Sequence, residues 1–276
     1  MAKKICFVLG AGGARGIAHI GFLQAMEENK IKPDYIVGCS MGAVVGACYS
    51  LGIPPEKMKS LAEELKFKDI VDINFQIFSK KSILHSVKMR KKIISLLEHN
   101  TFDDVKIPFT CVAVDLVKGK AIGLNKGSLV DAVCASSAIP TIFRPVEMDG
   151  MDLVDGGILE RVPVRFAKEY KPDIIVAVDV LGKLQPYVET RSVLQHLLRT
   201  LDVNDCYHTE KYLKKYKPDV LVYPDLGDMS QYKVEKLSFA YEAGYKAGLE
   251  AVKQIKKLKR AKPTEKAPTK SKAKSK

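Results

Sequence analysis

The stretch that decides the fold covers residues 34–47 and reads D-Y-I-V-G-C-S-M-G-A-V-V-G-A. Its first four residues predict a short buried strand, and the small and apolar residues after Met41 predict a helix. Ser40 stands between them in a G-x-S-x-G pattern, flanked by Gly38 and Gly42. A strand, a sharp turn and a helix expose a nucleophilic serine, and the turn leaves no room for side chains at the flanking glycines. We therefore predict that Ser40 is a nucleophile, although the pattern alone also arises by chance.

A glycine-rich turn, G-A-G-G-A-R-G, occupies residues 10–16 and lies between a hydrophobic strand and a helical pattern at residues 17–26. A dinucleotide site requires glycine at the first, third and sixth positions, but the sixth position here is Arg15. The same geometry suits an oxyanion, because consecutive glycine N–H groups ahead of a helix converge on one point. We therefore favour an oxyanion loop. Arg15 then orients this loop, attracts an anionic head group, or forms a surface salt bridge.

A candidate carboxylate follows a predicted hairpin at residues 146–154, in which Asp149 and Gly150 supply a type I′ turn. Asp155 comes directly after the second strand and is followed by Gly156 and Gly157. A carboxylate in this position is accessible to a partner and is held by the strand. The alternative is that Asp-Gly-Gly forms a simple turn.

The order of these three motifs resembles the bacterial patatin-like phospholipases over residues 4–180. The runs A-S-S-A-I-P at 135–140, V-P-V at 162–164 and I-V-A-V-D-V at 175–180 add to the resemblance. Two positions depart from the family pattern. Ala11 replaces a usual glycine, and Arg161 stands where relatives often carry a small amide.

The resemblance implies a Ser–Asp dyad that needs no histidine. It makes Ser40 the nucleophile and Asp155 the base. The remaining site residues that it implies are the oxyanion amides and loop (Gly12, Gly13, Ala14, Arg15, Gly16), the nucleophile turn (Gly38, Gly42) and the turn after the base (Gly156, Gly157). The expected activity is that of a serine lipid acyl hydrolase, of phospholipase A or lysophospholipase type, which cleaves carboxylic esters through an acyl-Ser40 intermediate without a cofactor.

Two other functions fit parts of the sequence. An α/β-hydrolase triad could use Asp179 with His196 or His208, but only one recognisable strand precedes Ser40, which leaves little room for the strands that normally come before that turn. A non-catalytic module that binds lipid or protein could keep the same fold. The presence of both Ser40 and Asp155 argues against it.

Composition and patterning predict an α/β three-layer sandwich with a central, mainly parallel sheet, because strand-like and helix-like segments alternate along 276 residues. No run of about 18 apolar residues is present, and a strand begins after four residues, so we expect neither a membrane span nor a secretory leader. The six cysteines lack paired spacing, which favours a reduced, cytoplasmic protein. The histidines lack ligand spacing, so no metal is predicted.

The positive charge is concentrated at the C-terminus. Residues 253–276 carry 11 basic residues and one acid, and so supply +10 of the net charge of +13. We predict a catalytic domain over 1–252 and a basic tail over 253–276, which begins as the end of a helix over residues 239–258 and is disordered after it. A polybasic segment near an anionic bilayer contributes about 1 kcal/mol per Lys or Arg. We expect peripheral contact with the inner membrane surface and no specific nucleic acid, while a solubility tail or a nonspecific nucleic-acid contact is the alternative.

Residues 71–98 combine apolar and basic side chains between the nucleophile and the next strand. Two interpretations remain open for this segment. It forms either a mobile cap that admits acyl chains and touches the bilayer, or ordinary helices packed on the core.

Overall fold

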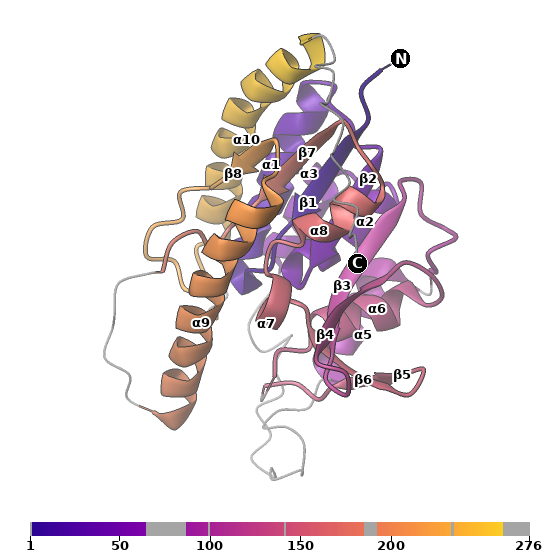
Figure 1. The fold of residues 1–276 in the computed structure, drawn as a ribbon, viewed down its shortest axis with the longest axis vertical. Helices are drawn as coiled ribbons and strands as arrows, with labels where there is room; N and C mark the ends of the chain where they lie inside the picture. The colour runs from indigo at the N-terminus through magenta and orange to yellow at the C-terminus, as the bar shows by residue number, and fades with distance from the viewer. Residues whose placement is uncertain are drawn as a thin grey trace, which may run out of the picture.

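The computed structural model describes residues 2–64, 87–98, 100–140, 142–184, 192–232 and 235–261. In these residues one eight-stranded sheet carries helices on both of its faces (Figure 1). Five strands form a parallel centre in the order β3-β2-β1-β7-β8: Phe109–Asp115, Tyr35–Cys39, Ile5–Leu9, Ile174–Val178 and Val220–Val222. The predicted α/β fold with a central, mainly parallel sheet is confirmed.

The sheet's antiparallel part lies at β3. Strand β4 (Lys120–Leu124) pairs with residues 111–115 of β3, while β2 pairs with residues 109–112 and β6 (Met151–Asp155) with residues 113–115. Because β4 occupies one edge of β3 along residues 111–115, β2 and β6 must share the other edge. Their ends therefore meet, with Cys39 opposite Val112 and Asp155 opposite Ala113.

Strands β5 (Val146–Met148) and β6 form the predicted hairpin. Met148 pairs with Met151, and both turn residues have positive φ, at 50° for Asp149 and 74° for Gly150. These angles are those of a type I′ turn, whose twist matches that of the two strands.

Side chains of β1 alternate between two cores, because successive residues of a strand point to opposite faces. Ile5, Phe7 and Leu9 belong to the larger core, and Cys6 and Val8 belong to the smaller one. The larger core receives residues of α1 (Ala18–Glu28), α2 (Met41–Ser50), α3 (Pro55–Glu63), α5 (Val87–Leu97), α6 (Leu129–Ser136) and α10 (Leu237–Arg260). The smaller core receives residues of α8 (Val164–Glu169) and α9 (Val193–Tyr216).

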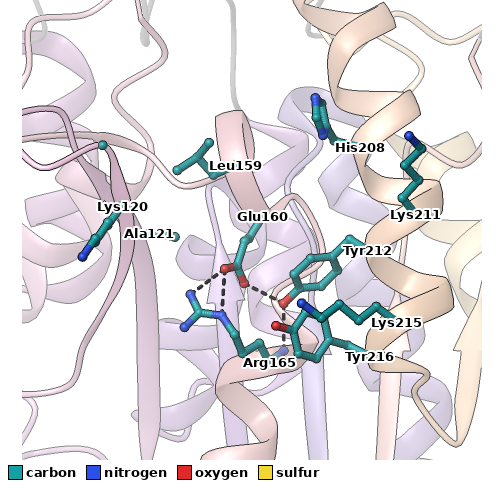
Figure 2. Close-up of a pocket in the computed structure, with 11 residues that line it drawn as sticks. Lys120, Ala121, Leu159, Glu160, Arg165, His208, Lys211, Tyr212, Lys215 and Tyr216 are labelled. Carbon is teal, nitrogen blue, oxygen red and sulfur yellow. Dashed lines mark hydrogen bonds and ion pairs between the residues drawn. The ribbon is translucent and has the colours of Figure 1, made fainter.

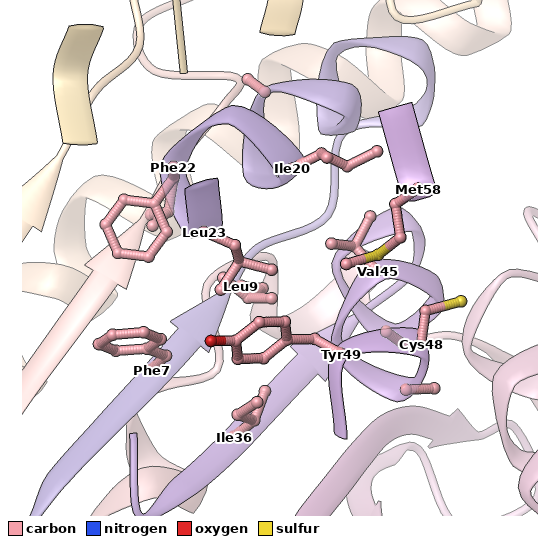
Figure 3. Packing of buried hydrophobic residues seen from close by; sticks show 14 of the residues in the cluster. Phe7, Leu9, Ile20, Phe22, Leu23, Ile36, Val45, Cys48, Tyr49 and Met58 are labelled. Atoms are coloured by element: carbon pink, nitrogen blue, oxygen red, sulfur yellow. The ribbon is translucent and has the colours of Figure 1, made fainter. Parts of the chain in front are cut away.

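Aromatic side chains fill the space between β1, β2 and the helices of the larger core. Phe7 of β1 meets Phe22 of α1 edge to face, with ring centroids 5.2 Å apart. Tyr49 of α2 lies over the same strands, as Figure 3 shows. Packing of this kind contributes beyond the area buried, and it fixes α2, the helix that follows Ser40, on the sheet.

Two expectations from the sequence concern segments that the structure describes only in part. Helix α10 continues through residues 253–260, with Ile255 fully buried, so the predicted boundary at 252/253 falls inside a helix. The rest of the predicted tail, residues 262–276, lies outside the described residues. Of the predicted cap, residues 71–86 also lie outside them, while α5 packs Met89, Ile93 and Leu97 into the core.

The helices that the structure describes bear on whether the chain crosses a bilayer. None of them combines the length and the apolar character needed to cross a membrane.

Candidate active site

Ser40 stands at the turn between β2 and α2. Its backbone has φ 54° and ψ −123°, a strained conformation for a residue with a Cβ, and its side chain is almost fully buried. A Cβ at Gly42 would lie 2.2 Å from the carbonyl oxygen of Leu9, and one at Gly38 would lie 2.6 Å from Cα of Ala43. The two glycines allow the helix to start directly against the sheet, with Ser40 at its N-terminus.

Asp155 lies against Ser40. The Ser40 hydroxyl donates to Asp155 Oδ2 at 2.5 Å, although 115 residues separate the two in the sequence. The other carboxylate oxygen, Oδ1, accepts the backbone N–H of Gly157 at 2.8 Å. Ser40 and Asp155 meet because β2 and β6 share one edge of β3, which brings the end of β2 next to the end of β6. A Cβ at Gly156 would lie 2.5 Å from the carbonyl oxygen of Val112, so glycine is needed there for the chain to pass β3.

The A-S-S-A-I-P run supports both members of this pair. Ser136 Oγ accepts the backbone N–H of Ser40 at 2.9 Å and donates to the carbonyl of Val112 at 2.6 Å. The carbonyl of Ala138 accepts the backbone N–H of Asp155 at 3.0 Å. In the sequence this run supports the family resemblance, but it does not indicate a role for Ser136. The signal that could have identified Ser136 is a small hydroxyl residue at the end of an apolar helix.

Burial raises the pKa of Asp155 from 3.8 to about 6. The hydrogen bonds from Ser40 and Gly157 oppose this shift, and the nearby Asp205 carboxylate adds to it. A carboxylate with this pKa is ionised at neutral pH and is a stronger base than an exposed aspartate. It can therefore accept a proton from Ser40.

The glycine-rich turn lies beside Ser40 and Asp155 and lines the same cavity with Gly12 and Gly13. Within the described residues, the amides of these two glycines make no hydrogen bond. Ala14, the third expected donor, differs, because its N–H donates to the carbonyl of Gln231 at 2.9 Å. The last two members of the predicted loop pack inward, since Arg15 is only 4% exposed and a Cβ at Gly16 would lie 2.4 Å from Met41 Cγ.

Arg161, the second departure from the family pattern, is buried beside this loop. Its guanidinium binds Asp179 and Asp205 at 2.8 Å each, and its carbonyl accepts the N–H of Ala11 at 2.9 Å. One residue thus connects the start of the glycine loop, the end of β7 and helix α9. Asp179, the carboxylate of the alternative triad, is held in this ion pair.

The histidines that the structure describes do not join the pair. His19 is fully buried, and its Nε2 lies 2.8 Å from the carbonyl oxygen of Gly10. Burial lowers the pKa of His19 to about 4, so it is neutral at physiological pH. His196 and His208 are exposed on α9, and neither hydrogen bonds with Ser40 or Asp155. The other two, at 85 and 99, lie outside the described residues.

The cavity over Ser40 and Asp155 has a volume of about 100 Å³. Its apolar walls come from Ile139, Pro140, Ile158, Leu181 and Leu201. In the described ranges, no three His, Cys, Asp or Glu side chains are arranged to hold a metal ion. The arrangement joins a hydroxyl, a carboxylate and two unpaired amides beside apolar side chains, and this combination can perform acyl transfer.

Three comparisons show which known proteins this chain resembles. A family model described as patatin-like phospholipase matches residues 7–168. The chain is 36% identical over 181 residues to an uncharacterized NTE family protein of Mycobacterium tuberculosis, which covers 66% of this chain and 50% of that protein. It is 28% identical over 191 residues to the lysophospholipase nte1 of Aspergillus fumigatus, covering 65% of this chain and 12% of that protein.

The fold also resembles a solved structure, VipD from Legionella pneumophila, with a TM-score of 0.60, 14% identity, and coverage of 91% of this chain and 67% of that one. This likeness concerns the fold alone. The chain spans about half the length, or less, of the curated relatives it matches. The family match covers more than half of this chain and includes Ser40, Asp155 and the glycine-rich turn. The chain belongs to the patatin-like phospholipase family.

Proposed function

We propose that this protein is a serine lipid acyl hydrolase, of phospholipase A or lysophospholipase type, that uses a Ser40–Asp155 dyad. The observation that carries the proposal is the buried hydrogen bond of 2.5 Å from the Ser40 hydroxyl to the Asp155 carboxylate. Membership of the family and the printed name of the lysophospholipase relative support a lipid ester as the substrate.

The reaction begins when Ser40 Oγ attacks the ester carbonyl carbon while Asp155 takes the hydroxyl proton. The carbonyl oxygen becomes an oxyanion, which accepts hydrogen bonds from the amides of Gly12 and Gly13. Loss of one such donor costs about 3 kcal/mol in other enzymes. Asp155 then returns the proton to the leaving alcohol, and an acyl-Ser40 ester remains.

Water completes the cycle. Asp155 removes a proton from a water molecule, whose oxygen attacks the acyl-Ser40 carbonyl. The Gly12 and Gly13 amides stabilise the second oxyanion. Its collapse breaks the bond from the acyl carbon to Ser40 Oγ, which takes the proton back from Asp155 as the fatty acid leaves. The apolar side chains of Ile139, Ile158 and Leu201 around the cavity suit an acyl chain.

The proposal includes peripheral contact with anionic membrane through the basic C-terminal segment. Lys3, which precedes β1, donates to the carbonyls of Leu258 and Ala261 at 2.7 Å each. The C-terminal end of α10 therefore lies near the start of β1. Ser40 lies at the opposite end of the parallel strands, directly after β2 (Figure 1). None of the residues proposed for the reaction belongs to the basic segment, so we assign it recruitment and not catalysis.

A fluorophosphonate that labels active serines tests the assignment. Ser40→Ala should abolish labelling and the hydrolysis of a lysophospholipid panel followed by mass spectrometry, while far-ultraviolet circular dichroism stays unchanged. Ser60→Ala, at an exposed serine of α3, is the matched control and should behave as the native protein. Labelling that persists in Ser40→Ala, or that maps to Ser136, would contradict the proposal.

The alternative triad makes a different prediction for two histidines. His196→Asn and His208→Asn should each leave hydrolysis within about twofold of native, because surface substitutions away from special features rarely matter. A histidine variant as inactive as Ser40→Ala would favour the triad. A chain that is neither labelled nor active on any ester would favour the non-catalytic binding module.

A further inference from the structure

A second, larger cavity lies away from Ser40. Its volume is about 520 Å³, against about 100 Å³ for the cavity over Ser40 and Asp155. Helix α9 forms one wall with Lys211 and Lys215, and Lys120 of β4 lies across from them (Figure 2). Glu160, which ends α7 (Gly157–Glu160), and Arg165 of α8 lie between these walls.

The single acid of this cavity is already neutralised. Glu160 Oε1 accepts from Arg165 Nε at 2.9 Å and Nη2 at 2.5 Å, and Oε2 accepts from the Tyr212 hydroxyl at 2.6 Å. The Tyr212 hydroxyl in turn accepts the backbone N–H of Arg165 at 2.9 Å. Both oxygens of Glu160 are thus bonded within this cluster, and the positive charge of Arg165 offsets that of the carboxylate.

Three lysines of the lining supply further positive charge to this cavity. In the described part of the chain, none of Lys120, Lys211 and Lys215 forms an ion pair with a carboxylate. Lys211 Nζ donates to the Tyr207 hydroxyl at 2.5 Å and lies 4.1 Å from the centroid of the Tyr207 ring. Lys215 Nζ lies 5.1 Å from the ring centroid of Tyr216. A cleft lined by charges of one sign concentrates ions of the other.

We propose that this cavity binds a phosphate-bearing anion. Ammonium groups bind phosphate oxygens as point charges. Three ammonium groups line this cavity, and a phosphate ligand offers them more acceptor oxygens than a carboxylate ligand would. Leu159, which is 46% exposed, adds an apolar contact at the wall for whatever the phosphate is attached to. A phospholipid head group and a free phosphate ester share this chemistry.

The site is connected to the dyad through a short helix. Helix α7 ends at Glu160 and begins at Gly157, whose N–H holds the Asp155 carboxylate. The proposal concerns binding alone and does not depend on the hydrolase assignment. It can therefore be tested in the full chain carrying Ser40→Ala, in which no lipid probe is consumed by the proposed dyad.

Two neighbouring lysines of α9 provide a matched pair of variants. Lys215 lines the cavity, while Lys214 is exposed, pairs with Glu210 and lies outside the lining. Titration with glycerol 3-phosphate and inorganic phosphate by calorimetry measures the free anions. Sedimentation with phosphatidylcholine vesicles, with and without phosphatidic acid, measures a lipid head group. The C-terminal segment contributes equally to both variants, so their difference reports on the cavity.

Lys215→Gln should weaken binding roughly tenfold, and adding Lys211→Gln should weaken it further, while Lys214→Gln stays near native. Dependence on Lys215 in the calorimetric arm identifies a free phosphate ester. Dependence confined to phosphatidic acid vesicles identifies a lipid head group. Equal binding by Lys215→Gln and Lys214→Gln in both arms, with native melting temperatures, would overturn the proposal.

Discussion

The hydroxyl of Ser136 holds Ser40 by its backbone, with a distance of 2.9 Å from the Ser40 nitrogen to Ser136 Oγ. The same oxygen donates to the carbonyl of Val112 at 2.6 Å, so it links the strained turn to β3. Ser136 is fully buried, and no solvent can replace it. It acts as a positioning residue for Ser40.

Ser136→Ala should therefore lower both stability and turnover. An unpaired buried N–H costs about 1–3 kcal/mol, and a displaced Ser40 should reduce kcat by roughly tenfold or more with little change in KM. Ser137→Ala is the matched control, because Ser137 Oγ is buried without a hydrogen-bond partner in the described chain. Thermal unfolding and steady-state kinetics measure both effects. Equal behaviour of the two variants would remove the role given to Ser136.

The pKa of Asp155 predicts how activity depends on pH. The base must be ionised, and burial raises its pKa to about 6, so kcat/KM should rise with pH through about 6 and then level off. Asp205→Asn removes a nearby negative charge that raises the pKa of Asp155, so this pKa should fall in the variant. The rise should therefore move to lower pH. A soluble ester followed across pH measures it, and an unmoved limb would show that another group titrates.

Asp155→Asn should stabilise the fold while it abolishes turnover. Because the pKa of Asp155 is raised from 3.8 to about 6, its ionised form destabilises the folded state above pH 6 by up to about 3 kcal/mol. As pH falls from 6 to about 4, the folded protein takes up this proton first and the cost disappears. The variant should melt at a higher temperature than native at pH 7.5 and at a similar one near pH 4. A lower melting temperature at neutral pH would contradict this account.

The sequence predicted what depends on neighbouring residues. The strand before Ser40, the glycines at 38 and 42, and the Asp149-Gly150 turn follow from local packing and turn chemistry, and the structure has each element where the pattern places it. The distance from Ser40 to Asp155 could not be derived in this way. It depends on two strands meeting on one edge of β3, which no local pattern encodes.

Long-range contacts also explain what the sequence missed. The Ala14 amide, expected to be an oxyanion donor, is taken by the carbonyl of Gln231 from a loop far along the chain. In the sequence Arg161 was only a departure from the family pattern, whereas in the structure its partners are Asp179, directly after β7, and Asp205 of α9. Helix α9 itself was not foreseen, since most of its residues face solvent and its apolar positions give little periodic signal.

The basic C-terminal segment should recruit the protein to anionic membrane without affecting chemistry. Residues 262–276 carry six lysines and one glutamate, and fifteen residues can extend to at most about 50 Å. Truncation after Ala261 keeps both carbonyls that Lys3 caps. It should leave the turnover of a soluble short-chain ester unchanged, because every residue proposed for the reaction is retained.

Binding to anionic vesicles should fall roughly tenfold or more in the truncated chain, since each lysine near the surface contributes about 1 kcal/mol. The loss should shrink at high salt, because screening removes the attraction that the full chain enjoys. A chain of native length with the six lysines changed to glutamine is the matched control and should bind like the truncated one. Vesicle sedimentation at two salt concentrations measures all three proteins. Native binding by the glutamine variant at low salt would show that charge in this segment does not recruit, and would leave Lys120, Lys211 and Lys215 as the cations to test at the membrane.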